Sequence, residues 1–228
     1  MRYLYAPPHC LKFLTGKTLC WQIPTREKKI FLTFDDGPTP GVTEQVLEIL
    51  QQFQARATFF VLGKNARENP GLIENILSHG HAIGSHGWDH LNGWKTPLKT
   101  YLANAESFPL PLEMPLYRPP YGRITPAQAW QMKKRGYTIV MWSVLSRDYE
   151  PRLNRQKAFQ QIISLTRDGS ILLFHDSLKA ASNCLAILPE LMGHFSAKGF
   201  SFESLSLAPA FLASGQQNND IFVPPKRS

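Results

Sequence analysis

The stretch IFLTFDDGP, residues 30–38, gives the first indication of the fold. Its apolar half, Ile30 to Phe34, predicts a short β-strand, and Gly37 with Pro38 predicts a sharp turn where that strand ends. Beyond the turn, apolar residues recur every three or four positions, as on one face of a helix: Val46, Ile49, Leu50 and Phe53. The sequence therefore predicts a strand, a polar turn and an amphipathic helix in succession.

The same alternation continues along the chain. We predict further strands at residues 57–62, 81–84, 137–142, 170–174 and 200–202, and a short one ending near Arg118. Helical patterns cover residues 70–78, 125–136, 153–166 and 183–196, whereas three prolines in 107–115 predict a loop. About seven strands that alternate with helices indicate an α/β fold with a parallel sheet, either closed into a barrel or doubly wound.

The composition is that of a folded globular protein. The chain has 228 residues, of which 43% are hydrophobic and 18% charged. This length favours one domain over residues 1–228, with a core at about 30–205, an N-terminal extension and a short C-terminal tail. No apolar run approaches the roughly 20 residues that span a bilayer. The N-terminus lacks the unbroken apolar region of a secretory signal, so we expect a cytoplasmic protein, or an extracellular one if a leader was removed.

The net charge of +8 could favour anionic partners such as nucleic acid or an acidic wall polymer. The basic residues form no long stripe and no aromatic RNA-binding motif, so we predict a solvated basic surface and no nucleic acid partner. The three cysteines, Cys10, Cys20 and Cys184, are too few and too scattered for a disulfide framework or a thiolate metal site.

Polar residues follow the predicted strands at five places. They are Asp35 with Asp36, His86 with His90, Arg118 to Gly122, Asp148, and His175 with Asp176. Because the carboxyl ends of parallel strands open on one face, we expect these residues to converge on one site.

Asp35 and Asp36 are adjacent in an extended segment, so their side chains point to opposite sides and can have different roles. One can bind a metal ion while the other faces a substrate. The alternative is a polar turn that caps the following helix.

His86 and His90 lie four residues apart, a spacing that lets one helical turn or a tight loop present both imidazoles to one ion. Two imidazoles and a carboxylate form a catalytic metal site when positions remain open for water. Such an ion lowers the pKa of bound water from about 15.7 to roughly 7. We expect one divalent ion, with Zn²⁺ first, while Co²⁺, Ni²⁺ and Fe²⁺ also suit these donors.

Five motifs in this order resemble the NodB-homology polysaccharide deacetylases of carbohydrate esterase family four, over residues 30–205. The motifs are TFDDGP at 33–38, H-x-x-x-H at 86–90, RPPYG at 118–122, WSVLSRDY at 142–149 and LFHD at 173–176. The resemblance implies a distorted (β/α) barrel that removes acetyl groups from carbohydrate with the help of a metal ion.

By the same resemblance, Asp36, His86 and His90 are expected to bind the metal ion, and Asp35 is expected to be the general base, paired with and oriented by Arg118. An amide is a poor electrophile with a poor leaving group, so the site must also stabilise an oxyanion and protonate the departing amine.

The resemblance assigns those remaining functions as well. His175 is expected to be the general acid with Asp148 as its partner, and the backbone N–H of Tyr121 to help hold the oxyanion. Trp142 and Leu173 are similar to residues that line the pocket for the acetyl methyl group.

The implied substrate is an acetylated oligo- or polysaccharide that contains N-acetylglucosamine, such as a chitooligosaccharide or peptidoglycan. One alternative is a carbohydrate-binding protein with little turnover, since Gly87 and Leu145 depart from the family pattern. Another is an esterase that acts on O-acetylated xylan with the same groups.

Overall fold

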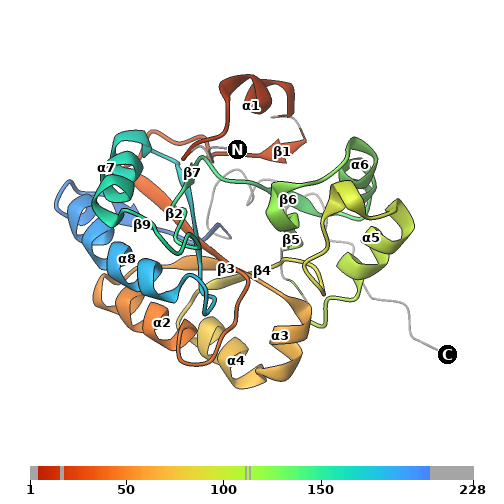
Figure 1. The fold of residues 1–228 in the computed structure, drawn as a ribbon, viewed down its shortest axis with the longest axis horizontal. Helices are drawn as coiled ribbons and strands as arrows, with labels where there is room; N and C mark the ends of the chain where they lie inside the picture. The colour runs from red at the N-terminus through yellow and green to blue at the C-terminus, as the bar shows by residue number, and fades with distance from the viewer. Residues whose placement is uncertain (1–4, 16–17, 111, 113, 206–228) are drawn as a thin grey trace.

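The computed structural model describes residues 5–15, 18–110, 112 and 114–205, and its centre is a curved sheet of parallel strands (Figure 1). In chain order the strands are β1 (Leu19–Cys20), β2 (Lys29–Asp35), β3 (Ala57–Val61), β4 (Ala82–Ser85), β5 (Leu116–Tyr117), β6 (Thr138–Val140), β7 (Val144–Leu145), β8 (Ile171–His175) and β9 (Ser201–Phe202). The predicted short C-terminal tail lies outside the described residues.

The strand order is β1-β6-β5-β4-β3-β2-β8-β7, with β9 beside β2, and every strand pairing is parallel. The order begins at β1 and ends at β7, so the described part of the sheet is a curled partial barrel. The predicted α/β fold is confirmed. Two strands, β1 and β7, were not predicted.

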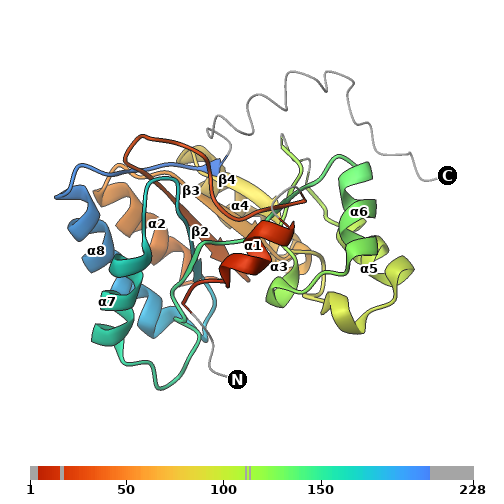
Figure 2. The same ribbon diagram turned by 90° about the horizontal axis from the view of Figure 1, so that it is seen from above.

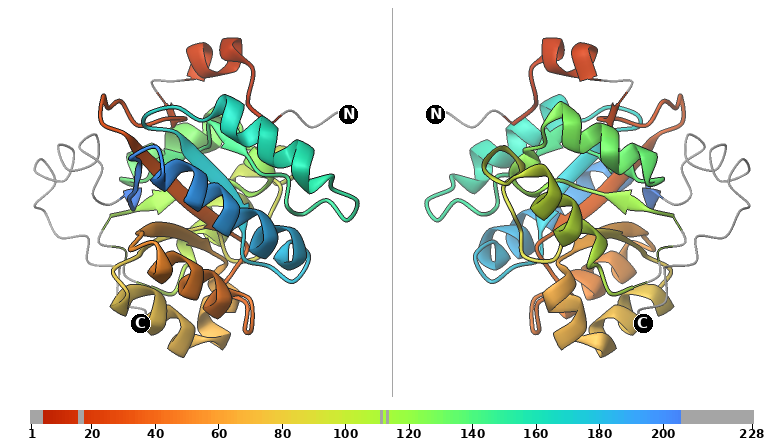
Figure 3. Two further views of the ribbon diagram at one scale, coloured as in Figure 1. Left: turned by 90° about the vertical axis from the view of Figure 1, so that its left-hand side faces the viewer. Right: turned by 90° about the vertical axis from the view of Figure 1, so that its right-hand side faces the viewer.

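Helices cover the outside of the curved sheet. They are α1 (His9–Thr15), α2 (Thr43–Gln52), α3 (Gly63–Glu68), α4 (Pro70–Ser78), α5 (Leu98–Glu106), α6 (Pro126–Lys134), α7 (Arg155–Leu165) and α8 (Ala181–Ser196), with 3₁₀ turns η1 (Gly93–Lys95) and η2 (Pro120–Gly122). Helices α7 and α8 lie at one end of the molecule and α5 and α6 at the other (Figure 2), and α2, α7 and α8 cover one side (Figure 3). No helix in the described ranges is long and apolar enough to cross a bilayer.

Two of the predicted helices begin with a side-chain cap. Thr125 and Gln128 form a capping box at the start of α6, and the Asn154 side chain accepts the Lys157 N–H at the start of α7. Helices α1, α3 and α5 were not predicted. The segment 107–115 contains no helix or strand among its described residues, as its prolines predicted.

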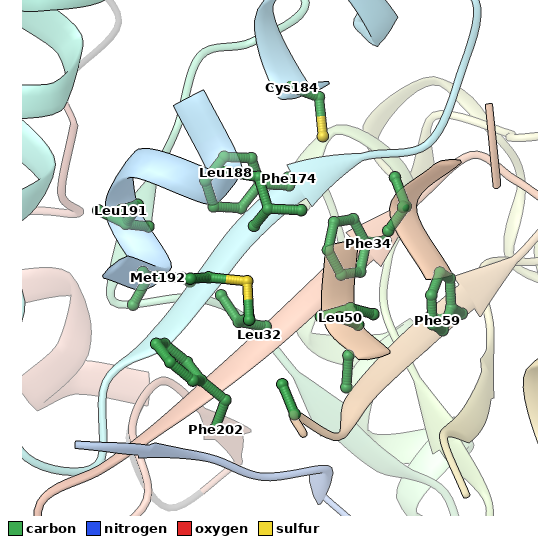
Figure 4. Close-up of a cluster of buried hydrophobic side chains, with 14 of the residues drawn as sticks. Leu32, Phe34, Leu50, Phe59, Phe174, Cys184, Leu188, Leu191, Met192 and Phe202 are labelled. Atoms are coloured by element: carbon green, nitrogen blue, oxygen red, sulfur yellow. The ribbon is translucent and has the colours of Figure 1, made fainter. Parts of the chain in front are cut away.

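The alternation of side chains along β2 divides the core into two layers. Ile30, Leu32 and Phe34 face outward into the large cluster under α2 and α8, where Phe34 stacks on Phe59 of β3 with ring centroids 5.0 Å apart (Figure 4). Phe31 faces the interior of the curve and packs in a separate cluster. Every second residue of β2 after Phe31 therefore also faces the interior. The last of these residues is Asp35, at the carboxyl end of the strand.

Candidate metal centre

The carboxyl end of β2 separates the two aspartates, as strand geometry predicts. Asp35 is the last strand residue, and its side chain is 4% exposed on the interior side. Asp36 has a left-handed backbone with φ of 77°, so the chain leaves the sheet at this residue. The two carboxylates therefore belong to different environments although they are adjacent in sequence.

Asp36, His86 and His90 lie together. The Oδ1 atom of Asp36 is 3.2 Å from Nε2 of His90 and 3.6 Å from Nε2 of His86, and one ligand atom from each residue lies within 4.8 Å of the others. Asp36 Oδ1 is buried and has no hydrogen-bond partner among the described residues. A buried acceptor without a donor is costly, and a cation among these three atoms would satisfy it.

The electrostatics of Asp36 and the two histidines suit a cation. Burial raises the pKa of Asp36, but the nearby imidazoles of His90, His86 and His175 more than offset it, so the pKa lies below its usual value. Burial lowers the pKa of His86 to about 4 despite the adjacent carboxylates. The Nδ1–H of His86 donates to the Arg118 carbonyl at 2.8 Å, which leaves the lone pair of Nε2 directed at the group.

The loop that carries His86 and His90 is held by residues from other elements. The Asn104 side chain of α5 accepts the Trp88 N–H at 3.0 Å. Gly87 has φ of 78°, and a Cβ there would lie 2.9 Å from Asn104 Oδ1. Glycine at this position therefore suits the tight loop, and Asn104 provides a side-chain contact that no motif in the sequence indicated.

Arg118 is fully buried beside Asp35. Its Nη1 donates to Asp35 Oδ1 at 2.8 Å, which leaves Oδ2 of Asp35 facing His86 Nε2 at 3.7 Å. The other guanidinium contacts are with Thr33 Oγ1, the carbonyls of Val140 and Met141, and the ring of Phe60. These contacts fix both the charge and the orientation of the guanidinium, and hence the orientation of the Asp35 carboxylate.

His175 ends β8 directly beside Asp35, its register partner on β2. Asp148 accepts two hydrogen bonds from it, one from Nδ1–H and one from the backbone N–H, each 2.7 Å long. Burial alone would lower the pKa of His175, but Asp148, with smaller contributions from Asp36 and Asp35, raises it to about 9. The imidazole is therefore protonated at neutral pH.

The structure brings the remaining predicted residues to the same region. Tyr121 has φ of 58°, its ring lies 4.4 Å from that of His90, and its N–H donates to no described residue. Trp142 packs on the same turn, because a Cβ on Gly122 would come within 2.5 Å of its ring. Leu173 lies two residues before His175 in β8 and thus on the same face of that strand.

The sequence motifs included Asp176 but assigned it no role. Its buried carboxylate accepts the Gly37 N–H at 3.1 Å and the Thr43 hydroxyl at 2.6 Å, and its own N–H donates to the Asp35 carbonyl at 3.2 Å. Burial raises the pKa of Asp176 to about 7. The carboxylate thus ties β8 to the turn that carries Asp36, and its position directly after His175 was the only sequence signal for this.

Comparisons with known proteins show which proteins this chain resembles. A family model described as polysaccharide deacetylase matches residues 22–140. The chain is 34% identical over 194 residues to a peptidoglycan-N-acetylglucosamine deacetylase of Bacillus cereus, covering 82% of this chain and 90% of that protein. It is 34% identical over 203 residues to a chitooligosaccharide deacetylase of Azorhizobium caulinodans, with coverages of 81% and 96%.

One solved structure has a fold similar to that of this chain. The Bc1960 peptidoglycan N-acetylglucosamine deacetylase has a TM-score of 0.78 to this chain at 25% identity, with 89% of this chain and 96% of that chain covered. The range matched by the family model ends before the motifs at 142–149 and 173–176, and it is the structure that brings those motifs to the centre.

Proposed function

The chain belongs to the polysaccharide deacetylase family, and on this basis we propose that it hydrolyses the acetamide of N-acetylglucosamine units in an oligo- or polysaccharide. The reaction consumes water and gives acetate and an amine. The observation that carries the proposal is the buried Asp36 Oδ1, which lies near two imidazole nitrogens and has no hydrogen-bond partner among the described residues.

Asp36, His86 and His90 fit a divalent cation by donor type, by distance and by the unsatisfied oxygen. We propose Zn²⁺, because one carboxylate and two neutral imidazoles suit it, and Co²⁺, Ni²⁺ or Fe²⁺ would accept the same donors. A bound ion of this kind polarises the amide carbonyl and makes water more acidic.

We assign Asp35 as the general base. Arg118 holds its Oδ1, so Oδ2 can accept a proton from the attacking water on the side of the metal ligands. We assign His175 as the general acid, because its Nδ1–H is held by Asp148 and its other nitrogen can give a proton to the departing amine. Asp148 is thus a positioning residue.

The Tyr121 N–H is assigned to the oxyanion, since it is a donor without an acceptor among the described residues and belongs to a residue whose ring contacts that of His90. Trp142 and Leu173 are assigned to the wall that contacts the acetyl methyl group. The first packs on the Tyr121 turn, and the second shares a strand face with His175.

The test is acetate release from N-acetylglucosamine oligomers by the purified protein. A chelator should abolish acetate release, and added Zn²⁺ or Co²⁺ should restore it. An unfolding measurement on the chelated protein should show that it is still folded. Undiminished release from protein shown by elemental analysis to be free of metal would refute the proposal. Metal binding without acetate release from any oligomer would favour a carbohydrate-binding protein instead.

A further inference from the structure

One flank of the candidate metal centre carries two exposed aromatic rings with a cation between them. Tyr121, whose ring touches that of His90, is 60% exposed, and Trp94 is 66% exposed. The guanidinium of Arg123 lies 5.9 Å from the Tyr121 ring centroid and 5.1 Å from that of Trp94. A continuous series of rings and one cation therefore leads away from the metal ligands.

The other flank repeats this combination. The Tyr149 ring lies edge-on to His175 with centroids 5.2 Å apart, and the ammonium of Lys179 lies 5.5 Å from the Tyr149 centroid. Lys179 follows β8 by a few residues and is exposed. Each side of the centre thus has an aromatic ring in contact with a site imidazole and a cation stacked on that ring.

The first flank is built rigidly. A Cβ on Gly93 would lie 2.3 Å from the Arg123 carbonyl, so the η1 turn is in direct contact with the Arg123 backbone. The Gln128 side chain donates to the Gly93 carbonyl at 2.9 Å, and the Trp94 indole N–H reaches the Ile124 carbonyl at 3.4 Å. The backbone that carries Trp94 and Arg123 is therefore in place before a ligand arrives, which lowers the entropic cost of binding.

Neither flanking cation has a carboxylate partner among the described residues. Arg147 provides the contrast: it also stacks on a tyrosine ring, Tyr5, but its guanidinium is paired with Glu150 at 2.8 Å. Arg123 and Lys179 thus keep their donors for a ligand, and a guanidinium can pair with a carboxylate through two parallel hydrogen bonds.

Building on the proposed function, we propose that the two flanks are subsites for the sugars on either side of the reacting N-acetylglucosamine, and that they select sugars bearing a carboxylate. Aromatic faces are electron-rich and pack against the C–H face of a sugar ring, while Arg123 and Lys179 pair with the acid. In peptidoglycan strands that have lost their stem peptides both neighbours carry a free lactyl carboxylate, whereas in chitooligosaccharides they are neutral. The substrate class is therefore the acidic alternating glycan.

The test compares kcat/KM for acetate release from three tetrasaccharides of equal length. They are the alternating glycan with free lactyl carboxylates, the same glycan with these groups converted to methylamides, and chitotetraose. The protein should prefer the carboxylate form over the methylamide by about tenfold or more, as one charge-assisted hydrogen bond provides. Arg123→Gln and Lys179→Gln should each remove most of this preference.

Lys134→Gln is the matched control. Lys134 also stacks on an exposed tryptophan, Trp130, at 4.0 Å, but it ends α6, which leads into the amino end of β6 and thus away from the site. This variant should keep the full preference. Equal rates on the carboxylate and methylamide glycans, or equal losses on all three substrates in Arg123→Gln, would overturn the inference while the deacetylase function stands. Release from none of the three by metal-loaded protein would instead refute the proposed function, and the inference with it.

Discussion

Replacing Asp148 by asparagine tests the assignment of His175 as the general acid. Asp148 uses both carboxylate oxygens on His175, one for the imidazole Nδ1–H and one for the backbone N–H. Asparagine is nearly the same size but offers one acceptor oxygen and no charge. The variant therefore removes the charge that keeps His175 protonated and breaks one of the two hydrogen bonds, with little change in volume.

The expected effect follows from the pKa of His175. With Asp148 present the pKa is raised to about 9 from the usual 6.5, a difference of about 3 kcal/mol at about 1.4 kcal/mol per pH unit. Because the raised pKa keeps the acid protonated up to about pH 9, activity on amides should fall only as the pH rises through that value. Without the charge of Asp148, burial acts against protonation, and the pKa should drop to 6.5 or below.

At pH 8 this change would reduce the protonated fraction of His175 from roughly nine-tenths to about 3%, a loss of about thirtyfold. The assay is the pH profile of kcat/KM on an N-acetylglucosamine oligomer. The control is Asp168→Asn, which alters net charge equally at the amino end of β8, where the Asp168 carbonyl accepts a hydrogen bond from Gln22. The alkaline limit should move down by about 2.5 pH units or more in Asp148→Asn and stay near 9 in the control.

An unchanged alkaline limit in Asp148→Asn would refute the reasoning, because it would mean that another group supplies the proton. A direct titration of the His175 imidazole by NMR in the same variant gives a second readout. If the His175 pKa falls while the alkaline limit of activity does not, His175 is not the acid. If the pKa itself stays near 9, Asp148 is not what raises it.

Three further predictions concern the same region. Asp35→Asn should retain the metal ion and lose about 10²-fold or more in turnover, whereas His86→Ala should lose the ion; equal metal loss by elemental analysis would contradict the separation of base and ligand. His175→Ala should slow amide substrates more than O-acetyl esters, because an amine needs its proton more than an alcohol does, and equal losses would count against the acid role. Gly37→Ala should lower stability by about 1–3 kcal/mol in denaturant unfolding, because the new Cβ would meet Asp176 Oδ2 at 2.0 Å; an unchanged midpoint would show that the turn can yield.

Most of the fold could be predicted from periodicity. The apolar run at Ile30 to Phe34 became β2, and the helical spacing from Val46 to Phe53 became α2, because burial on one face imposes a repeat that is visible in the sequence. The exceptions are elements too short to show a repeat, such as β7, and α5, whose helical spacing was not recognised. Whether the sheet is closed or open depends on pairing between distant strands, and periodicity carries no information on that.

The difference between local sequence information and long-range packing also applies to the single residues of the site. The sequence by itself indicated which side chains are candidates for the site, since their types and their order after successive strands are local properties of the chain. Only the tertiary structure decided that Asp176 occupies the space beside Gly37 and that Arg123 stands between two exposed rings. These contacts depend on strand register and on how loops from separate elements pack, and both are set by the sum of long-range interactions over the whole chain.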